Sequence, residues 1–143
     1  MMTQQESQEI WNLIKDIKVA MLTSNDDGTL RARPMHHIQD EFDGTLWFYT
    51  AKSSGKVEEL QKQNQVCLSY ADPGIDTYVS LSGDVGFTQD KALIDKFWNS
   101  FSAAWFEGGK DDPDITLMEI RITQAESWDS KSKEVVPGVR TVC

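Results

Sequence analysis

Two arginines, one lysine and a polar turn are the residues in this sequence whose types and spacing best suit an anion. Arg31 and Arg33 lie two residues apart, so they share one face of a predicted strand. Lys56 follows the polar turn 53–55 and falls in the first turn of a predicted helix. A helix N-terminus has unpaired N–H groups and a partial positive charge, which a lysine opposes and a phosphate satisfies. The pattern therefore indicates a phosphate-sized anion site, although solvated surface charges would give the same residue types.

Other chemistries fit the side chains less well. His36 and His37 are adjacent, so they point to opposite faces of a strand and cannot chelate one metal ion together. There is no third histidine to serve a serine nucleophile as a base, and no GxSxG motif. Asp111, Asp112 and Asp114 lack the spacing of a calcium loop, so we expect them to be solvated or to cap a helix. We predict no metal site.

The composition describes an ordinary globular protein. A chain of 143 residues is long enough to bury one core, so we expect a single domain over residues 1–143. The formal net charge of −9 argues against nucleic acid or an anionic membrane as a partner. No apolar run is as long as a membrane span, and the sequence opens on polar residues, so we expect a cytoplasmic protein. Cys67 and Cys143 are expected to be a buried thiol and a tail thiol.

Hydrophobic periodicity divides the chain into helices and strands. A capping box at Thr3–Glu6 precedes apolar residues at helical spacing and marks the first helix. The predicted helices cover 4–16, 54–64 and 88–101. Alternation of apolar and polar residues predicts strands at 18–24, 66–70, 76–87 and 115–122, with a last strand or bend at 125–130.

A central hairpin is expected to hold the predicted anion site. It would run from Thr29 to Thr50 and turn at Asp43–Gly44, which places the two arginines across from the start of the second helix. Six or seven strands joined mostly by short connections, with helices outside them, predict a small antiparallel β-barrel.

Two local features have a predicted role of their own. Gly83 lies inside a predicted strand, which suggests a bulge or a close backbone approach. Trp105 and Phe106 lie in a glycine-containing loop without helical periodicity. We therefore expect both aromatic side chains to be exposed and to cover a flat ligand or a partner surface.

Five sequence motifs occur in the order and spacing of a known family. They are GTLRARPM, GTLWFYTAKSSGKVEEL, YVSLSG, WNSFSAAWFEGGKDDPD and AESWD. In this order they resemble the flavin-binding split barrels related to pyridoxamine 5′-phosphate oxidase, in particular the bacterial general stress proteins of that superfamily. The resemblance covers about residues 5–130. It implies a mainly β fold with peripheral helices, an antiparallel split β-barrel of six or seven strands, and a homodimer with FMN bound at the interface.

The resemblance assigns the basic residues to the phosphate group of FMN. Arg33 and Lys56 match the positions that bind this phosphate in the family, with help from Thr50, Ser54 and Gly55. The residues that indicate an anion site from their types alone are thus the ones that the family uses for phosphate.

The resemblance also implies contacts with the rest of the flavin. Backbone groups that face the isoalloxazine ring would come from three consecutive residues, Pro34, Met35 and His36. Tyr49 would lie near the ribityl-phosphate end, and Tyr78 matches a position from which the second subunit reaches the flavin. Trp105 and Trp128 match aromatic residues placed around the ring.

The C-terminal region departs from true pyridoxamine phosphate oxidases. Those enzymes carry an arginine- and histidine-bearing segment after a C-terminal tryptophan, whereas residues 129–143 contain Arg140 and no histidine. We therefore expect no oxidation of vitamin B6 phosphates. The resemblance implies an FMN-dependent oxidoreductase acting on an unknown small molecule, with a nicotinamide cofactor as a candidate electron donor. The alternative is a flavin-binding stress or sensor module without turnover.

Overall fold

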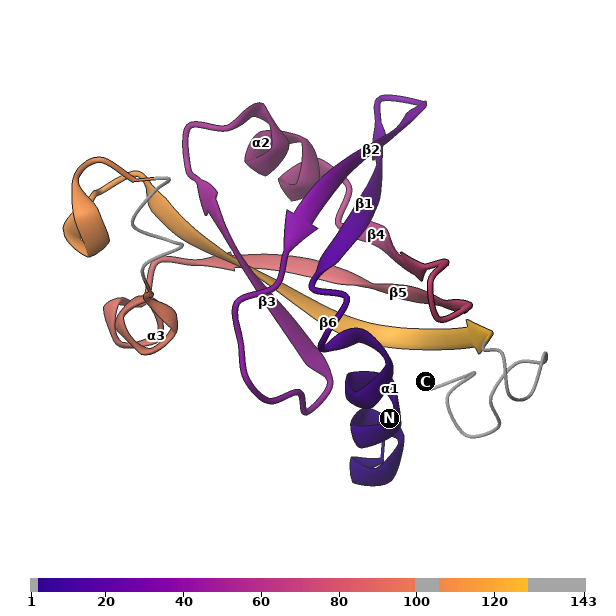
Figure 1. Ribbon diagram of the computed structural model, residues 1–143. Coiled ribbons are helices and arrows are strands. Elements are labelled where there is room, and N and C mark those ends of the chain that lie inside the picture. Colours follow the sequence, from indigo (N-terminus) through magenta and orange to yellow (C-terminus); the bar gives the residue numbers. More distant parts are fainter. Residues whose placement is uncertain (1–2, 100–105, 129–143) are drawn as a thin grey trace.

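Six antiparallel strands form one strongly curled sheet in the computed structural model, which describes residues 3–99 and 106–128 (Figure 1). The strands are β1 (Val19–Asp26), β2 (Thr29–His36), β3 (Thr45–Ala51), β4 (Gln65–Asp72), β5 (Thr77–Thr88) and β6 (Ile115–Trp128). Their order is β2-β1-β4-β5-β6-β3, so β2 and β3 are the edges of the sheet. The helices are α1 (Gln4–Ile14), α2 (Gly55–Lys62), α3 (Lys91–Phe97) and the 3-10 helix η1 (Gly109–Asp111). The predicted antiparallel, mainly β fold with peripheral helices is confirmed.

Alternation along the strands places apolar side chains inside the curl of the sheet. In β4, Val66, Leu68 and Tyr70 are buried, and the residues between them are partly or fully exposed. The strands β1, β3 and β5 follow the same pattern, so their inner faces meet in one apolar core. Full burial of a leucine such as Leu68 stabilises the fold by about 1.5–3 kcal/mol.

The predicted central hairpin between Thr29 and Thr50 is wrong, because β2 and β3 do not pair with each other. Instead, β2 pairs with β1, and β3 pairs with β6. The tight turn is at Asp27 and Gly28, whose φ angles of 52° and 92° suit a two-residue hairpin. The Asp43–Gly44 pair ends a longer loop. Turn residues indicate where the chain reverses direction. Which two strands then pair with each other depends on the packing of the whole sheet.

The two edge strands are held near each other without forming a ladder. Just beyond β2, the backbone N–H of Ile38 donates to the carbonyl of Trp47 at 3.2 Å. The buried side chain of Gln39 then accepts from the Trp47 N–H at 2.8 Å and donates to the Thr45 carbonyl at 2.7 Å. The Gln39 side chain thus forms hydrogen bonds with backbone groups of β3 that a neighbouring strand would form in a closed barrel.

Two amphipathic helices lie near opposite ends of the curled sheet (Figure 1). In α1 the predicted capping box is confirmed, since Thr3 and Glu6 exchange hydrogen bonds of 3.0 Å. Ile10 and Ile14 are fully buried in the main core. In α2 the two predicted apolar positions, Val57 and Leu60, are the buried residues, and the others are half-buried or exposed. None of the described helices is long and apolar enough to cross a membrane.

A second apolar cluster lies between α3 and the outer faces of β3 and β6. Ile94 and Phe106 are buried there against Ile115 and Leu117, with Tyr49 at the edge of the cluster. The expectation that Phe106 is exposed is therefore wrong, because Phe106 is buried in the cluster that α3 forms with β3 and β6. Trp105 lies outside the described residues.

A bulge bends the sheet where β5 meets β6. The register shifts between Ser82 and Gly83, and a side chain at Gly83 would overlap the carbonyl oxygen of Arg121. Both features predicted for this glycine, a bulge and a close backbone approach, are confirmed. The strand predicted at 115–122 continues through this irregularity to Trp128 as one long strand, so the separate last element predicted at 125–130 is not separate.

A buried histidine joins α1 to the sheet. His37 is 4% exposed, its Nδ1 lies 3.1 Å from the hydroxyl of Tyr70, and its ring packs 5.1 Å from that of Trp11. Burial, reinforced by the neighbouring charge of His36, lowers the pKa of His37 from 6.5 to about 4. The folded protein therefore keeps this imidazole neutral at pH values where an unfolded chain would protonate it.

This lowered pKa predicts acid-sensitive folding. Because the folded pKa is depressed, the stability linked to His37 is fully present above pH 6.5 and is lost as pH falls toward 4. Between pH 7.5 and pH 5 the loss should be about 2 kcal/mol. Urea denaturation of the unmutated protein and of His37→Gln at both pH values measures it. A variant that loses as much stability on acidification as the unmutated protein would contradict the assignment.

Candidate anion-binding site

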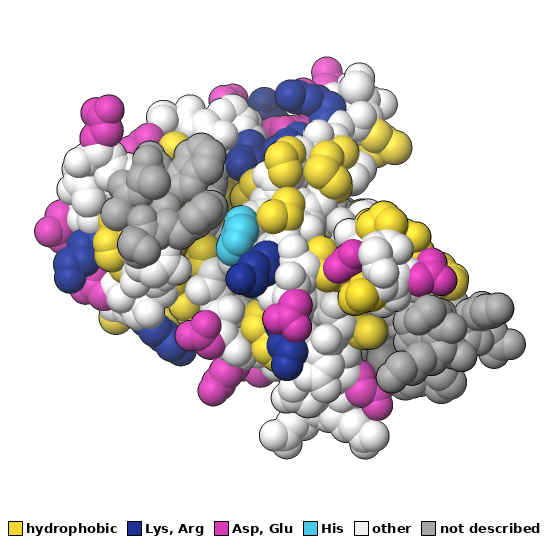
Figure 2. Space-filling view, in the orientation of Figure 1, with side chains coloured by type: hydrophobic (Ala, Val, Ile, Leu, Met, Phe, Trp, Pro, Cys, Tyr) yellow, Lys and Arg dark blue, Asp and Glu magenta, His cyan; other side chains and the backbone are white. Residues whose placement is uncertain are grey.

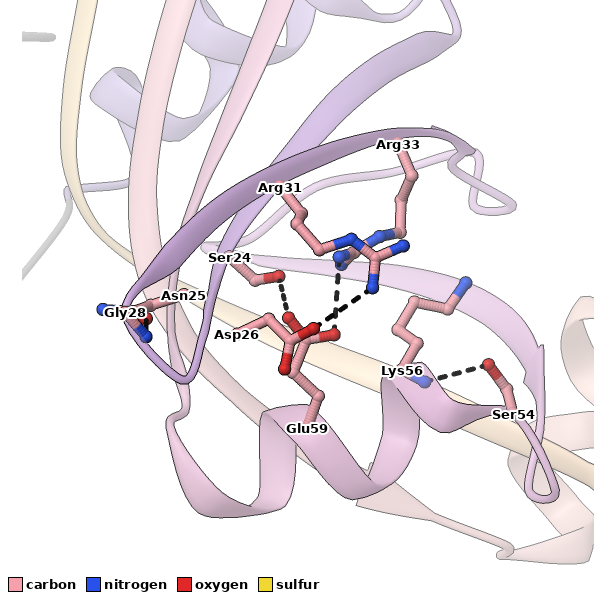
Figure 3. Close-up of polar contacts among 9 residues, drawn as sticks. All are labelled: Ser24, Asn25, Asp26, Gly28, Arg31, Arg33, Ser54, Lys56 and Glu59. Carbon is pink, nitrogen blue, oxygen red and sulfur yellow. Dashed lines mark hydrogen bonds and ion pairs between the residues drawn. The ribbon is translucent and has the colours of Figure 1, made fainter.

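An open pocket of about 490 Å³ lies between β2 and the start of α2. It is lined by Asp26, Arg31, Arg33, Ser54, Gly55, Lys56 and Glu59. Figure 2 shows basic side chains gathered on this part of the surface, and Figure 3 shows them converging above α2. The predicted meeting of the arginines with the helix start is confirmed, but a curled sheet and not a hairpin brings them together.

Arg33 is much more buried than Arg31, the other arginine of the pocket. The Arg33 side chain is 17% exposed, and its Nη2 lies 3.4 Å from Oε2 of Glu59, which is 8% exposed. The hydroxyl of Ser24 donates to the other oxygen of Glu59 at 2.8 Å. The second terminal nitrogen of Arg33, Nη1, is buried and has no hydrogen-bond partner among the described residues. A buried donor without a partner is unfavourable, so the geometry favours an acceptor in the pocket.

Lys56 faces Arg33 from the first turn of α2. Ser54 is the N-cap of this helix, and its hydroxyl oxygen accepts from the Lys56 backbone N–H at 3.2 Å. The Lys56 ammonium lies 3.3 Å from the sulfur of Met35, which is only a weak acceptor. Burial, and after it the positive charge of Arg33, lowers the pKa of Lys56, while Glu59 acts in the opposite direction. A bound anion would relieve this repulsion between the two cations.

The charges around the pocket leave an excess of one positive charge. Three basic side chains face the carboxylates of Asp26 and Glu59, in a chain whose net charge is −9. Arg31 pairs with Asp26 at 3.2 Å, but both side chains are largely exposed and the pair is weak. The buried pair of Arg33 with Glu59 mainly fixes the direction of the guanidinium.

Ser24, Asp26 and Glu59 are site residues that the sequence analysis missed. For Glu59 a signal was present, because it follows Lys56 by three residues and must share its helix face. For Ser24 no local signal exists, since its contact with Glu59 depends on how α2 packs against β1.

The other residues predicted to contact the flavin from β2 and β3 do not line the pocket, and of these Met35 contacts the pocket residue Lys56. Pro34 is exposed on the edge strand β2, where its missing N–H disturbs no ladder. Met35 is buried beneath Lys56. His36 is half-buried, and its Nδ1 donates to the carbonyl oxygen of His37 at 2.7 Å. Thr50 is buried on the inner face of β3.

The predicted aromatic residues lie apart from the pocket lining. The Tyr49 hydroxyl donates to the carbonyl of Ile94 in α3 at 2.6 Å, and burial raises its pKa to about 12. Tyr78 and Trp128 are cross-strand neighbours on the outer face of β5 and β6, and both are more than a third exposed. Trp105 falls outside the described residues.

Comparison with known sequences identifies relatives along nearly the whole chain. Residues 5–142 match the family described as pyridoxamine 5′-phosphate oxidase like. General stress protein 26 of Bacillus subtilis is 32% identical over 123 residues, which cover 83% of this chain and 86% of that protein.

Solved structures agree with the fold. The general stress FMN/FAD binding protein of Xanthomonas citri is 30% identical, with a TM-score of 0.77 over 99% of both chains. A Clostridium acetobutylicum protein related to general stress protein 26 has a TM-score of 0.78 over 94% of both chains at 21% identity, which supports the split-barrel fold alone. The chain therefore belongs to the pyridoxamine 5′-phosphate oxidase-like family and is related to its general stress protein 26 members.

Proposed function

We propose that the pocket between β2 and α2 binds the phosphate group of FMN and that the chain is a flavin-dependent oxidoreductase. The observation that carries the proposal is the buried, unpartnered Nη1 of Arg33 beside the partly desolvated ammonium of Lys56. At neutral pH a phosphate monoester is nearly doubly charged and has three acceptor oxygens, which matches these donors. The similarity to the FMN/FAD binding protein of Xanthomonas citri supports a flavin as the ligand.

The residues of the chain would then bind and orient the cofactor. Arg33 and Lys56 would hold the phosphate, and Ser54 and Gly55 would present the start of α2 to it. The flavin, when bound, supplies the redox chemistry, while the protein determines its position and surroundings.

We further propose that a second copy of the chain covers the outer face of the sheet. α3 covers only the part of this face formed by β3 and β6. Over the rest, several large apolar side chains are exposed: Val19, Met21, Leu30, Tyr78 and Trp128. Large apolar side chains left exposed on one face of a sheet are typical of an interface. Pro34 and His36 lie on this face of β2 and are close in sequence to the pocket residue Arg33, so we expect a partner docked there to lie near a bound flavin.

Binding of FMN and riboflavin tests the phosphate site, because the two ligands differ only in the phosphate. Two charge-assisted hydrogen bonds of about 1.5–3 kcal/mol each predict at least about a hundredfold preference for FMN. Arg33→Ala and Lys56→Ala should each weaken FMN binding about tenfold or more and leave riboflavin binding nearly unchanged. Fluorescence-quenching titrations measure both ligands.

Arg31→Ala is the matched control for these titrations. Arg31 lies on the same strand face, but it is 58% exposed and already paired with Asp26, so its loss should weaken FMN binding less. Equal affinity of the unmutated protein for FMN and riboflavin would show that the phosphate site is wrongly assigned.

The proposed interface predicts a dimer that one charge on β1 disrupts. Met21 lies between Pro34 of β2 and Ser69 of β4 on the uncovered face, so Met21→Glu should give monomers. Ile75→Glu is the control, because Ile75 is also a large exposed hydrophobic residue but lies in the turn after β4. Sedimentation velocity at micromolar concentration distinguishes the species. A stable, folded monomer of the unmutated chain would rule out this interface.

Turnover separates the oxidoreductase from a flavin-binding sensor. We expect the FMN-loaded protein to oxidise NADH or NADPH in steady state with at least one of a panel of acceptors. Tight FMN binding without turnover would favour the sensor. Pyridoxal 5′-phosphate should not be formed from pyridoxine 5′-phosphate, because residues 129–143 contain one arginine and no histidine.

A further inference from the structure

A single carboxylate holds the turn that leads into the start of α2. Oδ1 of Asp114 accepts from the backbone N–H of Ser53 at 2.9 Å, and Oδ2 accepts from the Ser53 hydroxyl at 2.8 Å. The Asp114 carbonyl also accepts from the Lys52 N–H at 2.7 Å. Both donors of Ser53 are thus bound to a residue that lies about 60 positions further along the chain. The expectation that Asp114 is only solvated or capping is corrected.

Asp114 is itself fixed in place by the sheet. It directly precedes Ile115, the first residue of β6, which pairs with Ala51 at the end of β3. Its backbone N–H donates to the Asp112 carboxylate at 2.9 Å. The side-chain amide of Gln89 donates to the carbonyls on either side of Asp114, at 3.2 and 3.0 Å. The carboxylate therefore projects from a rigid strand end and not from a free loop.

We propose that Asp114 is a positioning residue for the anion pocket, acting through Ser53. Ser53 directly precedes Ser54, the N-cap of α2, so fixing Ser53 fixes the path by which the chain enters the helix. That path decides where Gly55 and Lys56 stand in the pocket. Asp114 does not line the pocket, so it contributes geometry and no direct contact. The inference rests on the proposed phosphate site.

Electrostatics alone would argue against a carboxylate at this position. A negative charge near an anion site weakens anion binding, so neutralising Asp114 should strengthen binding if charge were its only influence. Asparagine separates the two effects. Its amide oxygen can accept from the Ser53 N–H, and its NH₂ group can donate to the Ser53 hydroxyl, which accepts as well as donates. Asp114→Asn therefore keeps both contacts without the charge, whereas Asp114→Ala removes them.

Titrations with FMN and riboflavin test the proposal. Asp114→Ala should weaken FMN binding about fivefold or more, which corresponds to about one hydrogen bond, and change riboflavin binding less than about twofold. Asp114→Asn should bind FMN at least as tightly as the unmutated protein does. Ser53→Ala, which removes only the hydroxyl contact, should show an intermediate loss. Asp111→Ala is the control, because Asp111 lies in the same segment but pairs with Lys91.

A second measurement, hydrogen exchange of the flavin-free protein, tests the positioning directly. The amides of residues 53–57 should exchange faster in Asp114→Ala and at the unmutated rate in Asp114→Asn. Unchanged exchange, or equal loss of FMN and riboflavin affinity in Asp114→Ala, would overturn the proposal while leaving the phosphate site intact. Equal affinity of the unmutated protein for both flavins would overturn the phosphate site itself, and exchange alone would then decide whether Asp114 positions the turn.

Discussion

The charged guanidinium of Arg33 is largely shielded from solvent. Three elements of the fold contribute to the contacts that offset the cost of this desolvation. β2 carries the arginine, α2 supplies the carboxylate of Glu59, and β1 supplies the hydroxyl of Ser24 that holds this carboxylate. A buried charge is unfavourable unless it is paired and hydrogen-bonded. Because Glu59 satisfies only one terminal nitrogen, Arg33 is oriented before any ligand arrives and still has a donor to offer. Together with the burial of Val57 and Leu60, this contact holds α2 against the sheet.

The opening of the sheet makes that contact possible. If β2 and β3 paired, the barrel would close and no helix could enter between them. They are instead the two edges, linked near one end by Ile38, Gln39 and Trp47. Near the other end, α2 approaches the inner-facing side chains of β2 (Figure 3). Residues 23 positions apart, Arg33 and Lys56, therefore meet across the split.

Much of this arrangement follows from the sequence, and the limits have physical causes. Alternation fixes which face each side chain occupies, so the shared side of Arg31 and Arg33 was predictable. The bulge was predictable from a different signal, the glycine at position 83 inside a strand. Alternation does not fix which strands pair, so the hairpin over 29–50 was predicted wrongly, although Arg33 and Lys56 do line one pocket. Tyr49 points to the outer face of the sheet, as its position in β3 requires. That its hydroxyl donates to the carbonyl of Ile94 depends on the packing of α3. Local sequence patterns therefore predict which face of a strand a side chain occupies, whereas tertiary packing determines which strands pair and which side chains touch.

The pocket shows why counting charges is a poor guide to anion affinity. Glu59 lies within the pocket together with Asp26, and Asp114 binds the turn next to it, although simple electrostatics would place no carboxylate there. Glu59 and Asp114 each accept two hydrogen bonds or ion-pair contacts. These contacts fix the guanidinium in one case and the helix entrance in the other, the two groups on which the proposed anion binding would depend. A fixed donor avoids the entropic loss of ordering a flexible side chain when the ligand binds. The negative charges are therefore compatible with an anion site, because a preorganised cation binds more tightly than a mobile one.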